Sequence, residues 1–494
     1  MLTATRLVAA LAPVAALLSV AAPAQASTDE LITRQARLAA NATAAPLQSD
    51  RMTSLTSRHG QLGISGCFMP TAPIFVTSGI ESIQVWNVRT PTAPKLVGTL
   101  PHVLFENEAM NCGERRTKSG TQRFALIGVD LVQAAPDDPE HVNVGGGELI
   151  VVDVTRPSAP RIRSRTPGST STHTVACATP RDCTHAYSAG DSGSKSFSIF
   201  DLRNLDRPRE LDAAPRKAGL QAFPSPTAGH KWNFDSAGYG THTGFDGSAM
   251  FDVRRPARPR LVTTTGAAGR GDDPRHPGYN DFIHHNSFRP NAKAFRPGAK
   301  PSLANGNVLL VTEEDYEQPD CSKAGSFQTW WVKRLDGTKN AIVPLDKVEL
   351  ADLGTYPLPV GAFCSSHWFD YRPGGLAAVG FYGGGTQVLD VRDPRDIKPY
   401  AHSVHGASEV WDAMWVPVYK DGKQTGAKTQ VVYAIDLVRG LDVYRVTLPG
   451  QTPPPAAPPL LPTEALLGSS VLPLGLVGGA VVLSAGIARR RRAR

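Results

Sequence analysis

Short apolar stretches recur along this chain, each followed by a polar residue and a turn that contains proline. The five clearest copies span residues 82–88, 149–154, 198–202, 249–253 and 387–391. Alternating apolar and β-branched residues predict a strand in each copy. A second short strand follows the turn, so the repeating unit is strand, acidic or amide residue, proline turn, strand. Such units pack on one another because none buries both of its faces alone.

The polar residue and the prolines place this unit within a sheet. Asn87, Asp153, Asp201, Asp252 and Asp390 end the five apolar stretches. An Asp or Asn side chain there can accept the backbone N–H groups of the following turn. Proline lacks an N–H donor, which confines it to turns and edge strands. The unit therefore belongs at the outer part of each sheet.

Two weaker copies, at residues 327–332 and 441–446, bring the number of repeats to seven between residues 60 and 447. A period of about 55 residues is typical of propeller blades with long loops. The expected fold class is all-β, as a single seven-bladed β-propeller. No outer strand follows Val446, so we expect the chain between residues 50 and 66 to supply one and close the ring.

The repeated unit, with its strand, Asp and prolines, resembles the LVIVD repeat. Proteins that carry this repeat look like β-propellers, and the resemblance covers most of residues 60–447. A weaker similarity exists at Phe282-Ile283-His284-His285-Asn286, which resembles a His-His-Asn segment of selenium-binding proteins. Those proteins are propellers too, so both resemblances imply the same fold.

The two ends of the chain predict export and anchoring. Residues 1–26 read as a signal peptide, with the apolar run 7–22 and a small-residue cleavage site at Ala24-Gln25-Ala26; an uncleaved N-terminal anchor is the alternative. Residues 27–59 precede the propeller, and residues 448–470 form a proline-rich spacer. Residues 471–488 predict a transmembrane helix, and residues 489–494 a basic cytoplasmic tail. We therefore expect a propeller on the cell surface, held at the membrane by the C-terminal helix.

The segment Leu461-Pro462-Thr463-Glu464-Ala465 resembles the sorting signals that sortases cleave in bacterial surface proteins. It departs from the usual Leu-Pro-x-Thr-Gly at its fourth and fifth residues. Sortase processing of the C-terminus therefore stays an open alternative.

The net charge of +8 includes five arginines in the C-terminal tail, so the rest of the chain is near +3. This charge balance does not indicate a nucleic-acid-binding surface, and we expect no nucleic-acid partner. The six cysteines in an exported chain indicate disulfides, and the absence of a C-x-x-C spacing argues against a zinc site. Cys177–Cys183 is the clearest pair, and Cys67–Cys112 and Cys321–Cys364 follow as the remaining sequential pairs.

One His or Glu opens the first strand of six repeats, ahead of the repeated unit. These residues are Glu108, His173, His230, His285, His367 and Glu409, with His59 as a loose match in the first repeat. The first strand of each blade lines the channel of a propeller, so equivalent residues would form a ring at one channel mouth. Such a ring could bind a divalent transition metal, for example copper, zinc or iron. A structural role, in which the side chains bond neighbouring blades, is the alternative.

Two functions remain compatible with these patterns. The first is a surface-displayed binding module that meets an unknown protein or small molecule at its channel mouth, without being an enzyme. The second is a metal-dependent enzyme, such as an oxidase, that uses the His/Glu ring. Other polar groups are expected outside any site: His242, His276, His402 and His405 follow no register and predict exposed loops, and Glu313-Glu314-Asp315 predicts a solvated loop, with calcium binding as the alternative.

Overall fold

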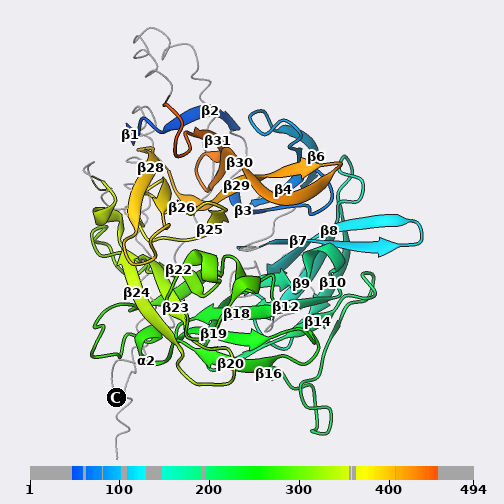
Figure 1. The fold of residues 1–494 in the computed structure, drawn as a ribbon. Coiled ribbons are helices and arrows are strands. Elements are labelled where there is room, and N and C mark those ends of the chain that lie inside the picture. Colours follow the sequence, from blue (N-terminus) through cyan, green and yellow to red (C-terminus); the bar gives the residue numbers. More distant parts are fainter. Residues whose placement is uncertain are drawn as a thin grey trace, which may run out of the picture.

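A computed structural model describes residues 47–58, 63–79, 82–101, 108, 110–129, 147–190, 195–354, 358, 363–406 and 408–453. Seven antiparallel sheets are arranged in a ring around a common centre (Figure 1). Six of them have four strands and one has five, and a separate two-stranded sheet accompanies the third blade. The prediction of an all-β, seven-bladed propeller is confirmed.

Each blade is a meander whose strands run outward from the centre in chain order, except where the ring closes. The inner strands are β3 (Gly63–Phe68), β7 (Asn111–Thr117), β11 (Thr174–Cys177), β17 (Gly229–Phe234), β21 (Ile283–Phe288), β25 (Phe369–Arg372) and β29 (Val410–Lys420). The second strands are β4 (Ile74–Gly79), β8 (Gly120–Val129), β12 (His185–Ala189), β18 (Tyr239–Gly244), β22 (Val308–Glu314), β26 (Leu376–Gly380) and β30 (Lys423–Asp436).

The third strands are the apolar stretches of the sequence repeat: β5 (Ser82–Asn87), β9 (Glu148–Asp153), β14 (Ile199–Asp201), β19 (Gly247–Asp252), β23 (Phe327–Val332), β27 (Thr386–Asp390) and β31 (Gly440–Val446). The outer strands of the first six blades are β6 (Lys95–Pro101), β10 (Arg161–Pro167), β15 (Arg209–Glu210), β20 (Arg260–Thr264), β24 (Ile342–Val348) and β28 (Lys398–Val404). The extra pair consists of β13 (Ser196–Phe197) and β16 (Phe223–Pro224). Helices are limited to single turns: η1 (Pro180–Asp182), α2 (Gly266–Gly269), η2 (Ala292–Ala294), η3 (Leu303–Asn305) and η4 (Leu350–Asp352).

The seventh blade takes its outer strand from the N-terminal side of the chain. Strand β2 (Met52–Arg58) pairs antiparallel with β31, from Met52 opposite Val446 to Arg58 opposite Leu441. Strand β1 (Leu47–Gln48) adds a fifth strand to the sixth blade through β28. The expected closing strand is therefore present, and it joins the two ends of the ring through backbone hydrogen bonds.

The core is divided among the interfaces between blades. Within the described residues, seven buried apolar clusters each join one blade to the next, including the seventh blade to the first. At that last interface the rings of Phe75 and Tyr433 lie 5.4 Å apart. Because no blade buries both faces alone, this arrangement makes the ring a single cooperative unit.

The proline turns contribute to these interfaces. Asp252 accepts the backbone N–H of Arg254 at 3.1 Å, and the equivalent residues of four other blades make the same contact. The carbonyl of the first turn proline accepts a hydrogen bond from the preceding blade in three blades. The pairs are Tyr433 to Pro91 at 2.8 Å, Tyr187 to Pro256 at 2.6 Å and Thr329 to Pro394 at 2.6 Å. The repeated unit thus has two structural roles: it turns the chain, and it accepts hydrogen bonds from the neighbouring blade.

Three disulfides are present, Cys67–Cys112, Cys177–Cys183 and Cys321–Cys364, as predicted. The first joins inner strands of blades 1 and 2, and the second lies within blade 3. The predicted signal peptide, spacer, transmembrane segment and basic tail lie outside the described residues or reach only to their edge. Among the described residues, no helix has the length and apolar character needed to cross a membrane.

Candidate metal centre

Five of the six side chains predicted for the ring meet near the centre of the propeller. The four histidines lie in or just before the inner strands of four successive blades, and Glu108 lies three positions before β7. His230 and His285 lie inside β17 and β21, whereas Glu108, His173 and His367 lie just before β7, β11 and β25. All five are buried, and none is more than 4 % exposed.

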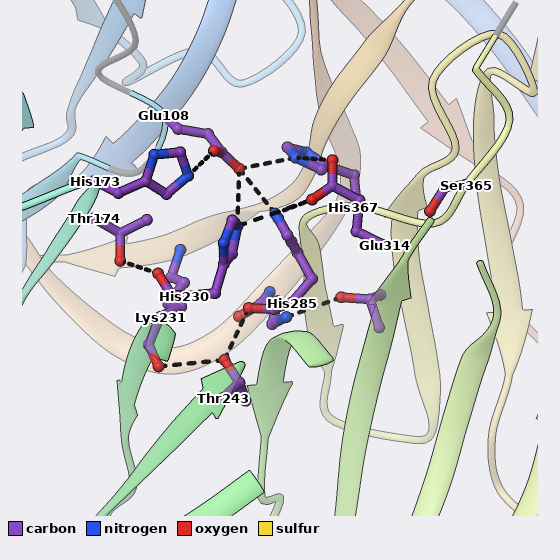
Figure 2. A network of polar contacts seen from close by, with 12 residues as sticks. Glu108, His173, Thr174, His230, Lys231, Thr243, His285, Glu314, Ser365 and His367 are labelled. Atoms are coloured by element: carbon purple, nitrogen blue, oxygen red, sulfur yellow. Dashed lines mark hydrogen bonds and ion pairs between the residues drawn. The ribbon is translucent and has the colours of Figure 1, made fainter. Parts of the chain in front are cut away.

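Glu108 is the point on which the histidines converge (Figure 2). Its Oε1 lies 2.8 Å from Nε2 of His285, 2.9 Å from Nε2 of His367 and 3.5 Å from Nε2 of His230. Its other oxygen, Oε2, pairs with Nε2 of His173. Four imidazole nitrogens from four blades therefore face one carboxylate.

A second carboxylate, Glu314, completes this group. Its oxygens lie 3.6 Å from Nε2 of His285, 3.8 Å from Nε2 of His367 and 4.0 Å from Nε2 of His230. We call Glu108, Glu314 and the four histidines the central cluster. The prediction of a solvated loop at residues 313–315 was wrong, since all three acidic side chains are buried. Glu314 ends a second strand and not a first, so the register of the inner strands carried no signal for it.

Among the described residues, two groups of possible metal ligands have their ligand atoms within 4.8 Å of one another, and Glu409 belongs to neither group. Its carboxylate accepts the indole N–H of Trp411 at 3.1 Å. The residue opens its inner strand as predicted, but Glu314 is the second carboxylate that approaches the histidines. His59 lies outside the described residues.

Tyr382 binds Glu314 beside His367. Its hydroxyl donates a hydrogen bond to Oε1 of Glu314, and its ring lies 4.6 Å from that of His367. Tyr382 adopts a φ of 46°, a left-handed conformation that is uncommon for a residue with a side chain. Such strain persists only where surrounding structure enforces it, and it is often found at functional sites.

Burial decides the protonation of the central cluster. Burial lowers the pKa of His230 to about 4 and lowers the pKa of His285 well below its usual 6.5, so both rings are neutral at pH 7. Burial alone raises the pKa of Glu108, but the nearby His173 and His230 outweigh it and hold that pKa well below 4.5. Burial raises the pKa of Glu314 to about 7. A buried anion thus faces the neutral rings of His230 and His285.

The hydrogen bond of His367 fixes what this ring presents to Glu108. Its Nδ1 lies 2.7 Å from the carbonyl oxygen of Trp411, which can only accept, so Nδ1 carries the proton. In a neutral ring Nε2 then has a lone pair, directed at an anionic oxygen 2.9 Å away. Two lone pairs at that separation repel unless a positive charge lies beside both. A backbone carbonyl bound to the far nitrogen is also the usual support of a metal-bound histidine.

The spacing of the donors suits a metal ion. With metal–ligand bonds of about 2.1 Å, neighbouring donors lie about 3.0 Å apart in an octahedron and about 3.4 Å apart in a tetrahedron. The separations of 2.8, 2.9 and 3.5 Å around Oε1 of Glu108 lie close to these values. Two overlapping sets, Glu108 with His230 and His285, and Glu314 with His285 and His367, could each hold an ion. Both ring nitrogens of His230 and Nε2 of His367 are buried without a hydrogen-bond partner among the described residues.

An aromatic wall encloses the central cluster. Trp368 lies against His285, with ring centroids 4.0 Å apart, and Trp411 lies 5.0 Å from His367. The ammonium group of Lys231 lies 3.4 Å from the centroid of the Trp368 ring. Burial lowers the pKa of Lys231 to about 8. The wall keeps water from the histidines and lowers the local dielectric, which strengthens any interaction with a cation.

Two histidines outside the central cluster differ from expectation. His242 lies in β18, fully buried, and its Nδ1 bonds the Ser225 hydroxyl at 2.8 Å, so its prediction as an exposed loop residue was wrong. His402 lies in strand β28, not in a loop. His276 does lie in a loop, with its side chain 38 % exposed. His284, the neighbour of His285, points away from the central cluster and bonds Ser248 at 2.8 Å.

Comparisons with known proteins agree on the fold alone. No family model matches the chain, and no curated protein matches it. Solved structures with similar folds include the β-propeller domain of Cps50 (Swd1) from Myceliophteria thermophila, at 10 % identity and a TM-score of 0.49, covering 80 % of this chain and 100 % of that one. Sqt1 of Saccharomyces cerevisiae shows 11 % identity, a TM-score of 0.45 and coverage of 79 % and 97 %. Hydrazine synthase of Kuenenia stuttgartiensis shows 14 % identity, a TM-score of 0.46 and coverage of 79 % and 97 %.

Proposed function

We propose that this protein is an exported metalloprotein that holds one divalent transition-metal ion in the central cluster of its propeller. The observation that carries the proposal is the crowding at Glu108, where one carboxylate oxygen has three histidine nitrogens within 3.5 Å. A carboxylate oxygen has two lone pairs and neutral imidazoles bring lone pairs of their own, so hydrogen bonds alone do not account for this arrangement.

The number and type of donors narrow the choice of metal. Four imidazoles and two carboxylates exceed the four ligands of a tetrahedral zinc site. Nitrogen and oxygen donors without sulfur suit iron, copper or manganese in a five- or six-coordinate site. These ions change oxidation state, so a metal-dependent oxidoreductase such as an oxidase is the enzyme class that the centre fits. A propeller that only stores or senses the metal would use the same ligands.

The location of the protein fits this role. Three disulfides indicate an oxidising compartment. We propose that the chain is exported, as its N-terminal residues predict, and displayed at the cell surface by its C-terminal segment. The repeated turns support a place among LVIVD-like propellers.

Metal analysis of the purified full-length chain tests the proposal. We expect about one equivalent of iron, copper or manganese per chain after dialysis, retained by the wild type and lost in His285→Ala and His367→Ala. His276→Ala is the matched control, because this half-exposed histidine lies in a loop outside the central cluster. Equal metal content in all four proteins, or none in the wild type after reconstitution with each of the three metals, would sink the proposal.

A further inference from the structure

The turns between third and outer strands gather positive charge on one face of the propeller. In the first six blades they lie in residues 87–95, 153–163, 201–209, 252–260, 332–339 and 390–398, and all except the turn of blade 5 contain proline. Because every blade has the same strand order, all six turns lie at the same end of the ring. We call this end the basic face.

The six turns alone carry more net positive charge than the whole chain. They contain 18 Lys and Arg residues against eight Asp residues, whereas the whole chain has 52 basic and 44 acidic residues. Sixteen of the 18 basic side chains are exposed. Seven of the eight aspartates form ion pairs with basic side chains of these turns, and an excess of ten positive charges remains.

The central cluster lies toward the opposite face. Glu108 and the histidines precede or open the inner strands and Glu314 ends a second strand, all at the end of the ring away from these turns. The loop after β22 at that end carries Asp315, Glu317 and Asp320. The excess of Lys and Arg in the turns therefore lies at the end of the ring away from the central cluster, which the modest net charge conceals.

A hollow on the basic face offers room for a polar head group. It has a volume of about 310 Å³ and lies between the β7–β8 turn and the turn after β9. Hydroxyl groups of Thr117, Ser119 and Thr155 line it together with Arg156, Arg161 and Asp153, which pairs with Arg161. Arginines and hydroxyl groups in one concave site suit a phosphate ester.

The chain also leaves the propeller at this face. Strand β31 is a third strand, so its end at Val446 lies at the same end of the ring as the proline turns. The described chain continues to residue 453, within the proline-rich spacer, and the apolar segment 471–488 follows in the sequence. A membrane anchor there would tether the protein by its basic face.

We propose that the basic face docks on an anionic lipid membrane. Arginines close to such a surface are attracted to its phosphate groups, and the attraction decays within about 8 Å at physiological salt, so it acts only if this face lies on the membrane. Docking turns the central cluster away from the lipid, toward the medium. The inference is independent of the metal proposal, because no cluster residue takes part in it.

Hydrogen exchange of the full-length chain on lipid nanodiscs tests the proposal. One set of discs contains phosphatidylcholine alone, and the other also contains phosphatidylglycerol. We expect backbone exchange in residues 153–163 and 252–260 to slow by about tenfold on anionic discs, and the effect to disappear at high salt. Exchange in the loop after β22 stays unchanged.

Charge-reversal variants provide the matched comparison. Arg255→Glu with Arg258→Glu removes two exposed arginines of the basic face that form no ion pair with a described residue, and it should abolish the protection. Arg216→Glu with Lys217→Glu makes the same change in charge in an exposed segment between β15 and β16, toward the other face, and should leave the protection intact. Unchanged melting temperatures of both variants show that the fold is retained.

Three outcomes would overturn the proposal. The first is equal exchange on neutral and anionic discs. The second is equal loss of protection in the two variants. The third is protection of the turns by a soluble polyanion, such as a nucleic acid or a wall polymer, but not by anionic discs, which would assign the basic face to that partner instead.

Discussion

The Nε2 atom of His367 lies 2.9 Å from Oε1 of Glu108, while Nδ1 of the same ring bonds a backbone carbonyl. In its neutral form the ring therefore directs a lone pair toward an anion in a buried site. That arrangement is costly without a cation and favourable with one. Metal binding and a purely structural role, the two explanations that the sequence left open, therefore make different predictions for the Glu108–His367 pair.

Replacing Glu108 by Gln should distinguish these explanations. The substitution removes a buried negative charge but keeps the size of the side chain. If the central cluster binds metal, we expect affinity to fall by at least about 100-fold, because an anionic ligand is lost, while the metal-free protein is as stable as the wild type or more so. Chelator competition and calorimetry of the metal-free protein measure both. A destabilised protein with unchanged metal affinity would contradict the prediction.

The hydroxyl of Tyr382 should contribute to metal affinity without touching the metal. Tyr382→Phe keeps the ring beside His367 and removes only the hydrogen bond to Glu314. Loss of such a supporting contact typically weakens metal binding by about 10- to 100-fold. Tyr187→Phe, which removes a hydroxyl bonded to Pro256 in a blade interface, is the control and should leave metal affinity unchanged. Titration against a chelator gives both constants.

The sequence repeat predicted the blades and the register of the inner strands. It did not predict features that depend on contacts between residues of different strands. The seven blades followed from the apolar strand, the Asp and the prolines, because each residue type has one local role. Five members of the central cluster followed from their register on inner strands. Glu314 lies at the end of a second strand, where only the seventh blade also has an acidic residue, Asp436, so its burial was not visible in the pattern.

Single polar residues were misread for the same reason. The side chain of Glu409 has the right register, but it accepts a hydrogen bond from Trp411, two residues further along the strand. His242 is buried because Trp232 stacks on its ring at 4.6 Å and Ser225 bonds its Nδ1, and both partners are distant in sequence. The spacing of the sequence repeat identifies the strand on which a residue lies, but not which residues of other segments bury its side chain.

The disulfides should differ in their effect on stability because they close loops of different length. Cys67–Cys112 spans 45 residues and joins two blades, whereas Cys177–Cys183 spans six residues within one blade. Loop entropy predicts a loss of about 4 kcal/mol for the first and about 2 kcal/mol for the second when both cysteines of a pair become serine. Denaturant titration of the two double variants measures the difference. An equal loss would show that loop closure does not dominate.

Removal of the closing strand should open the ring. Strand β2 covers the edge of β31, and Met52 is buried against the interface between blades 6 and 7. A chain that starts after Arg58 leaves this edge unpaired, and exposed edges promote association. We expect aggregates in size-exclusion chromatography, whereas a chain that starts at residue 47 stays monodisperse. A monodisperse shorter chain of unchanged melting temperature would contradict the role of β2.

Acid should destabilise the propeller through His242. Burial lowers the pKa of this residue to about 3, whereas the unfolded chain titrates near 6.5. Between about pH 3 and pH 6.5 the unfolded state therefore binds a proton at this histidine, whereas the folded state does not. This residue's contribution to stability is complete above pH 6.5 and is lost as the pH falls toward 3, by up to about 1.4 kcal/mol per pH unit.

His242→Asn, which can keep the hydrogen bond to Ser225 and does not titrate, should flatten the fall in unfolding free energy between pH 6.5 and 4. His276→Asn, in a loop, should not. An equal slope in wild type and His242→Asn would assign the acid sensitivity to other groups.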